Sequence, residues 1–385
     1  MGVKHVAIVT SYPIPAEAVV YNRLSAFVRV LSQHGWTVTV LTAVPENEHT
    51  KFQGKAPDWN LVYVPVGDYD RRNFLVRGIN ELKLSRRLLR RAAELQPDVL
   101  VITIPSIFLL QFAVQRFTFP VVIDIRDLVW DYLPYSPWWK GMVRRLLRAG
   151  AIWALSRSDV ISFANPHQLD HIKTVLPSME LLLVSNGIGR EQFGYIRNLA
   201  PEPSQDKVLR ITYLGNVGLA QNLVTLIEAV AGIDSLQVNV VGAGTDLPRI
   251  REAVEHFGAT NVRLHGSMPW EDAVRWYART DVAYAQLASN FASAIPSKLY
   301  EYLAAGLPVI YGGTGAAVAA LSAFKGVTVV PPDSPQELRQ ALLDMLAAGN
   351  RDRQDANIEL IARNYIREDQ VDSIERVLSR LNEAT

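Results

Sequence analysis

The chain has 385 residues, of which 49% are hydrophobic and 20% charged. This length exceeds what one hydrophobic core usually serves, so we expect two domains, and the composition excludes disorder as the main state. No cysteine is present, which excludes disulfides, iron–sulfur clusters and cysteine nucleophiles and suits a reducing compartment. The start has no signal-peptide pattern, and the longest apolar run, at 99–114, is too short to span a bilayer. We therefore expect a cytoplasmic protein.

The net charge of +1 conceals opposite charges in the two halves. Residues 1–197 hold 23 Lys and Arg against 16 Asp and Glu, whereas residues 198–385 hold 16 against 22. The basic excess is concentrated at 71–91 and 132–158, and the second tract also contains three tryptophans. Basic side chains beside aromatic ones favour contact with the anionic inner face of the cytoplasmic membrane. Solvated amphipathic helices are the alternative, and no nucleic-acid recognition module is present.

Apolar strand-like runs alternate with helical segments in two series. The first series has runs at 5–10, 37–42, 98–104, 120–125 and 180–185, and the second at 208–214, 236–242, 261–265, 281–286, 307–311 and 326–331. Runs without strict alternation suit parallel strands that are buried on both faces. Each series therefore predicts a doubly wound, Rossmann-like α/β sheet.

The series restarts after a polar segment with two prolines, 198–207, which is typical of a linker. We expect a first domain over 1–197 and a second over 208–364, with the ligand in a cleft between them at the carboxyl ends of the strands. A final helix at about 365–385 has one apolar face and must dock on the rest of the protein.

The most informative segment is 294–313, which reads AIPSKLYEYLAAGLPVIYGG. It predicts a helix after a strand, with Ser297 at its start and Gly306 at its end. Free backbone N–H groups and the charge of Lys298 at that start would attract a phosphate. Glu301, one turn further on, could accept hydrogen bonds from both hydroxyls of a ribose. The alternative is a helix whose Lys and Glu are only solvated.

Two glycine turns accompany this segment. Residues 213–221, YLGNVGLAQ, follow the first strand of the second domain. Gly215 and Gly218 would let the backbone approach a diphosphate or a sugar closely, and Asn216 can both donate and accept. A purely conformational need for glycine is the alternative. The turn that begins at Gly242 resembles the opening of a dinucleotide fingerprint, although the third glycine is missing.

Together these segments carry a resemblance. The order YLGNVGLAQNL, VVGAGTD, VRLHGSM and IPSKLYEYLAAGLPVI resembles the donor-nucleotide domain of glycosyltransferase family 4, which contains retaining enzymes of the GT-B fold. The first half matches at HVAIVTSYP, LSQHGWTVTVLTAVP, VVIDIRDLVWDYLP and LLLVSNG. The subgroup that it most resembles transfers N-acetylated deoxysugars, such as N-acetylfucosamine, in bacterial surface-polysaccharide assembly.

The resemblance implies a nucleoside diphosphate sugar, UDP-linked, as co-substrate and a lipid-linked or saccharide acceptor, with no metal or other cofactor. The first domain would bind the acceptor, and the C-terminal helix would return to it. Lys298 would bind the diphosphate and stabilise the charge that develops on it, with help from the backbone at Ser297 and Leu299. Glu301 would bind the ribose. The remaining donor contacts would come from the glycine turns, at Gly215, Asn216, Gly218 and Gly242.

Several positions depart from the family pattern. Ser293 stands where many members have a first glutamate, and Asn216 and Gln221 stand where many have Arg and Lys. The usual His-Asp pair is Arg126-Asp127 here, and we expect these two residues on the acceptor side. A carboxylate among Asp124, Asp127 and Asp131 could orient or deprotonate an acceptor hydroxyl, although a salt bridge to Arg126 is the more ordinary role. The departures keep a catalytically inactive nucleotide-binding scaffold open as an alternative.

A nucleotide-sugar epimerase of the same architecture is a further alternative. The Asp68-Tyr69-Asp70 run spells a metal motif, but a solvated turn explains it better. His167 and His171 are four residues apart without a third ligand, so a helix surface is favoured over zinc.

Overall fold

The computed structural model describes the chain apart from residues 1–3, 15–17, 46–58, 68–73, 105, 114–116, 127, 129, 131–137, 203–207, 350 and 384–385. It divides into two compact units, one formed by 1–186 with 367–385 and the other by 187–366. None of the described helices combines the length and the apolar character that crossing a bilayer requires. The predicted Asp68 and Asp70 turn lies outside the described residues.

The first unit contains a seven-stranded sheet in which every neighbouring pair is parallel. Its strands, in spatial order, are β3 (Asn60–Val66), β2 (Trp36–Pro45), β1 (Lys4–Thr10), β4 (Val99–Ile104), β5 (Val121–Ile125), β6 (Val160–Phe163) and β7 (Leu181–Leu183). The central strands are buried throughout because helices cover both faces. The predicted series lacked β3 and β6: β6 has only four residues, and β3 is an edge strand that tolerates Pro65.

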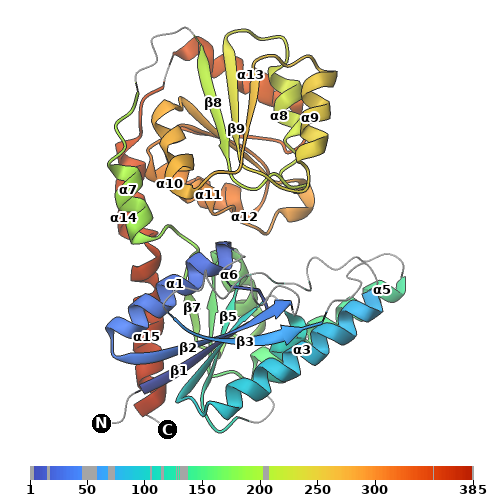
Figure 1. The fold of residues 1–385 in the computed structure, drawn as a ribbon, viewed down its shortest axis with the longest axis vertical. Helices are drawn as coiled ribbons and strands as arrows, with labels where there is room; N and C mark the ends of the chain where they lie inside the picture. The colour runs from blue at the N-terminus through green and yellow to red at the C-terminus, as the bar shows by residue number, and fades with distance from the viewer. Residues whose placement is uncertain are drawn as a thin grey trace. The chain divides into compact units, whose positions relative to one another are not determined.

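Helices cover each face of this sheet with a separate hydrophobic core. One core includes side chains of α3 (Phe74–Glu94), α4 (Ile107–Ala113), α5 (Trp138–Leu155) and α6 (Pro166–Val175). The other includes α1 (Ala18–Gln33) and α15 (Arg367–Glu383). Figure 1 shows α15, in red, beside α1 and the first strands. Three of the four apolar residues that predicted a docking face on the tail, Val371, Ile374 and Leu378, are buried in this core.

The second unit contains a six-stranded parallel sheet. Its strands, in spatial order, are β10 (Val262–Gly266), β9 (Leu236–Val241), β8 (Leu209–Leu214), β11 (Val282–Gln286), β12 (Val309–Gly312) and β13 (Val327–Val330). All six were predicted, to within a few residues. Their apolar runs are short and continuous because both faces of the sheet are covered.

One face of this sheet packs against α8 (Val224–Val230), α9 (Leu247–His256) and α13 (Pro335–Ala348). The other packs against α7 (Arg190–Arg197), α10 (Trp270–Ala273), the 3-10 segment η3 (Val274–Arg279), α11 (Lys298–Ala304), α12 (Ala316–Leu321) and α14 (Asp355–Asn364). A second 3-10 segment, η4 (Ser289–Phe291), lies between β11 and α11. In both units the predicted α/β architecture is confirmed.

The division between the units lies earlier in the chain than the sequence predicts. Helix α7 was assigned to the first domain, but Phe193 and Ile196 of α7 are buried in a core of the second unit. Nearby, the amide of Ile188 donates to the carbonyl of Tyr365, 2.9 Å away. Residues 187–197 therefore belong with the second unit because their apolar face is covered there, a contact that the linker composition cannot reveal.

Candidate functional site

The candidate site of the second unit lies where its strand order reverses, between β8 and β11. In an open parallel sheet, loops on the two sides of such a reversal run in opposite directions and leave room for a ligand at the carboxyl ends of the strands. The loop at 215–222 follows β8, and the segment at 287–297 leads from β11 to α11. Both predicted donor-binding segments therefore lie at this edge of one sheet.

Glycines allow two loops of this edge to interlock. Gly242 has φ +149°, and a Cβ atom there would lie 1.8 Å from the carbonyl oxygen of Gly215. The amide of Val217 donates to the carbonyl of Ala243 at 3.0 Å, and that of Asp246 donates to Val217 at 3.0 Å. Gly242 therefore sets the position of the β8 loop through close backbone contact, which gives this glycine a structural role.

Lys298 lies against the start of the same loop. A Cβ atom at Gly215 would be 2.9 Å from the Lys298 ammonium nitrogen, Nζ. That Nζ lies 3.7 Å from the ring centroid of Tyr213 and donates to its hydroxyl. The Tyr213 hydroxyl in turn donates to the backbone carbonyl of Asn216. One buried tyrosine thus connects the lysine of α11 with the glycine loop after β8.

The surroundings of Lys298 disfavour its charge. Burial lowers the pKa of the ammonium to about 7, and the carboxylate of Glu301 opposes that shift only in part. Burial also raises the pKa of Tyr213 well above its ordinary value, so its hydroxyl keeps its proton and can donate. A lysine in this state gains much from an added anion, because a nearby negative charge favours its protonated form.

Glu301 is held by a second buried tyrosine. The hydroxyl of Tyr277 donates to Oε2 of Glu301 at 2.9 Å. Burial, and next the Glu301 charge, raise the pKa of Tyr277 well above its ordinary value, so this donor also keeps its proton. Tyr277 belongs to η3 and packs edge-on against Tyr302 of α11, with ring centroids 5.6 Å apart. This hydrogen bond therefore fixes the direction of the Glu301 carboxylate.

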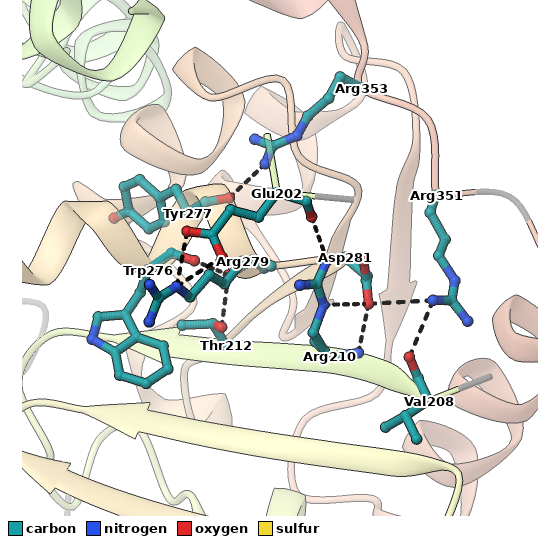
Figure 2. Close-up of polar contacts among 11 residues, drawn as sticks. Glu202, Val208, Arg210, Thr212, Trp276, Tyr277, Arg279, Asp281, Arg351 and Arg353 are labelled. Carbon is teal, nitrogen blue, oxygen red and sulfur yellow. Dashed lines mark hydrogen bonds and ion pairs between the residues drawn. The ribbon is translucent and has the colours of Figure 1, made fainter. Parts of the chain in front are cut away.

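An arginine cluster at the opposite, amino-terminal edge of the sheet anchors η3 and the end of α11 (Figure 2). Arg353 donates to the carbonyl of Tyr277 at 2.5 Å and to that of Ala305, at the end of α11, at 2.6 Å. Beside it, Arg210 and Asp281 form a paired contact with distances of 2.9 and 3.1 Å. Burial lowers the pKa of Arg353 to about 10. This cluster stabilises the frame of the site and does not contact the donor edge.

Three further residues that were predicted to bind the donor are Ser297, Leu299 and Gly218. Ser297 occupies the N-cap position of α11, but its side chain makes no capping hydrogen bond to the backbone amides at the start of that helix. The side chain of Leu299 is buried in the core, and its amide donates to Pro296 at 3.1 Å, so both of its groups are engaged within the protein. The amide of Gly218 donates to the side-chain oxygen of Gln221 at 3.1 Å, which closes the glycine turn.

The acceptor-side residues lie in the first unit, after β5. Arg126 places its guanidinium over the ring of Tyr12, 5.7 Å from the centroid. Asp127 and Asp131 lie outside the described residues. Of the three carboxylates considered there, Asp124 is fully buried and pairs with Arg23 instead of Arg126.

The Asp124 carboxylate accepts from Arg23 at 2.6 and 2.9 Å and from the hydroxyl of Ser162 at 2.7 Å. Arg23 also donates to the carbonyl of Val184 at 2.8 Å. This carboxylate joins β5, β6 and α1, and its oxygens are engaged within the fold. Among the described residues, no three His, Asp or Glu side chains come together as a metal site would need.

Sequence reasoning missed Tyr213, Tyr277 and Arg353. Tyr213 stood inside the quoted YLGN run, but its apolar neighbours indicated only a buried strand. Tyr277 and Arg353 stand in segments that carry no motif. Their roles depend on contacts with residues 24 to 85 positions away, or with carbonyls at the ends of helices.

The architecture is that of known GT-B enzymes. The chain is similar to sucrose-phosphate synthase from Thermosynechococcus elongatus, with a TM-score of 0.78, 16% identity and coverage of 99% of this chain and 100% of that one. It is similar to HepE from Anabaena in complex with UDP and glucose (TM-score 0.68, 13% identity, 97% and 99% covered). A third relative is the lipopolysaccharide outer core galactosyltransferase WaaB (0.62, 13%, 96% and 98%). The fold is therefore the GT-B fold of glycosyltransferases.

Two known domain families match the chain over most of its length. Residues 209–348 match the family described as glycosyl transferases group 1, and residues 21–187 match the glycosyl transferase 4-like domain. No curated protein matches the chain in sequence. The chain consists of these two domains over most of its length, and it is a glycosyltransferase.

Proposed function

We propose that the protein is a retaining glycosyltransferase that transfers a sugar from a UDP-linked donor to a lipid-linked or saccharide acceptor in surface-polysaccharide assembly. The observation that carries the proposal is the position of Lys298 against Gly215 in the group 1 domain, where burial has lowered its pKa to about 7. The structure of the similar HepE in complex with UDP and glucose supports the UDP-linked donor. The likeness to WaaB, a lipopolysaccharide galactosyltransferase, supports the acceptor class.

The proposed chemistry follows from where charge develops. The bond between the anomeric carbon and the diphosphate oxygen breaks, and the diphosphate gains negative charge while the acceptor oxygen bonds to that carbon. The proton of the acceptor hydroxyl would pass to the departing diphosphate oxygen. Lys298 would stabilise the leaving diphosphate from a position fixed before the reaction by Tyr213. Glu301, oriented by Tyr277, would hold the ribose hydroxyls. This assignment needs no metal ion, because Lys298 would offset the charge on the diphosphate.

The acceptor side rests on Arg126 and Asp127. Since Asp124 is committed to Arg23, Asp127 is the carboxylate that we propose to orient the acceptor hydroxyl, with Arg126 beside it. The transferred sugar would be an N-acetylated deoxysugar of the N-acetylfucosamine type, as the sequence resemblance implies. The reaction would take place at the inner face of the cytoplasmic membrane, to which the basic tracts 71–91 and 132–158 would attract the protein.

The proposal is tested with a panel of nucleotide sugars. A thermal-shift screen should show a higher melting temperature with UDP and one UDP-sugar, because a ligand of the folded state stabilises it. Transfer to a lipid extract is then measured for the wild type and for Lys298→Ala, with the exposed Lys325→Ala as the matched control. We expect kcat to fall about 100-fold or more in Lys298→Ala only. An unchanged kcat in that variant would reject the assigned role.

The same panel separates the alternatives. Glu301→Ala should weaken UDP binding in calorimetry with a smaller effect on kcat, and wild-type affinity would contradict the ribose contact. Conversion of the donor sugar without any acceptor would indicate an epimerase. Tight UDP binding with no transfer to any lipid extract would indicate a nucleotide-binding scaffold.

A further inference from the structure

Helix α5 exposes an apolar stripe to solvent. Its large hydrophobic side chains Trp138, Met142, Leu146 and Trp153 are 78%, 50%, 66% and 44% exposed. With 3.6 residues per turn, these four positions fall within about 80° of one another around the helix axis. A stripe of this size on one face is unusual for a surface helix, because such residues normally face the core.

The charge of the helix is all of one sign. Its 18 residues include four basic side chains and no acidic one. Around the helix axis, Arg145 lies about 20° from Trp138, on the side away from the other stripe residues. Arg148 lies about 60° further in the same direction. Just past the helix, the guanidinium of Arg157 lies 4.4 Å from the ring centroid of Trp153. Cationic groups therefore flank one side of the apolar stripe.

A hollow of about 520 Å³ opens beside this stripe. Arg145, Arg148 and Trp153 line it from α5, and Val175 and Leu176 line it from the end of α6. Its wall is mostly apolar, with the arginines as its charged groups. This combination suits a ligand that has a phosphate next to an acyl chain, because guanidinium binds phosphate in a fixed geometry and the wall excludes water from the chain.

The other basic tract, 71–91 on α3, differs from this surface. Among the described side chains of α3, Ile79 is the one large hydrophobic residue that is strongly exposed, at 53%. Arg91 of that helix forms an ion pair with Glu94 at 2.6 Å, and Arg86 lies over the ring of Phe112. Basic charge alone is therefore common to α3 and α5, whereas the apolar stripe and the hollow belong to α5.

We infer that the exposed face of α5, with its hollow, is a docking surface for a membrane of anionic phospholipid. The tryptophans, Met142 and Leu146 would insert at the level of the headgroups, and the arginines would bind lipid phosphates. The helix would lie on the membrane plane, since it is not apolar enough to cross a bilayer. The inference names the membrane partner in the proposed function and rests on it for its biological purpose. The surface chemistry stands independently of the reaction.

The test is sedimentation of the full chain with vesicles. We expect binding to vesicles that contain phosphatidylglycerol and little binding to vesicles of phosphatidylcholine alone. Arg145→Gln and Arg148→Gln should each weaken binding about fivefold, and added salt should weaken it further. Leu146→Ser should weaken it at least fivefold, because the side chain would no longer bury its surface in the lipid. All three residues are exposed, so the fold should remain unchanged.

Matched variants on α3 keep the inference falsifiable. Arg90→Gln removes the same charge and Ile79→Ser removes a similar exposed side chain, and each should weaken vesicle binding much less than the α5 variants do, because α3 would contribute only long-range attraction. Equal losses on both helices would overturn the inference in favour of diffuse attraction to charge. No binding at low salt would also overturn it, as would a dimer in solution that Leu146→Ser dissociates. UDP binding, measured in the same variants, should stay unchanged, and its absence in the wild type would count against the proposed function alone.

Discussion

The lowered pKa of Lys298 predicts that UDP binding depends on pH in a defined direction. Burial favours the neutral amine in the free protein, whereas a bound diphosphate favours the ammonium. Binding should therefore take up a proton, and affinity should fall as the pH rises above about 7. With that pKa, half of the molecules carry the charge at pH 7 and about one-tenth at pH 8. The dissociation constant should thus rise about fivefold from pH 7 to 8 and about tenfold from pH 8 to 9.

Calorimetry between pH 7 and 9 measures this effect, because the last ionisation of the UDP phosphate, near pH 6, is complete in that range. Titrations in buffers of different ionisation enthalpy should show an uptake of nearly one proton per UDP at pH 8. In Lys298→Met, which keeps the length of the side chain without its charge, the affinity should be lower and independent of pH. An equal affinity of the wild type at pH 7 and 9, or the same slope in the variant, would refute the reasoning.

Three further variants test single contacts. Tyr277→Phe removes the donor to Glu301 and should weaken UDP binding by about 1 kcal/mol in calorimetry; unchanged affinity would show that the carboxylate is oriented by other groups. Gly242→Ala would place a Cβ atom 1.8 Å from the carbonyl of Gly215, so thermal unfolding should show a loss of at least about 3 kcal/mol, and an unchanged melting temperature would contradict the interlocked loops. Asp124→Asn breaks a buried ion pair and should lower stability in urea by about 3 kcal/mol, with little effect on UDP affinity; wild-type stability would argue against its anchoring role.

The local patterns of the sequence were sufficient for the architecture. Every strand of the second sheet was predicted because a parallel strand that is buried on both faces leaves a continuous apolar run. In the first sheet, the short strand β6 and the edge strand β3 were missed, because a run of four residues or an edge strand with Pro65 has little periodic signal. Lys298 and Glu301 were placed on one helix because the sequence marks where that helix begins and ends, and their role in binding a donor stays a prediction.

Only the tertiary structure decided which groups hold those residues. Tyr213 and Lys298 are 85 residues apart, and their contact exists because β8 and β11 are neighbours in the sheet and α11 follows β11. The same holds for Arg23 and Asp124, 101 residues apart, whose pairing no sequence pattern indicated. Periodicity is a property of neighbouring residues, so it determines which segments are buried. Which side chains meet depends on strand order, and strand order is set by the packing of the whole unit.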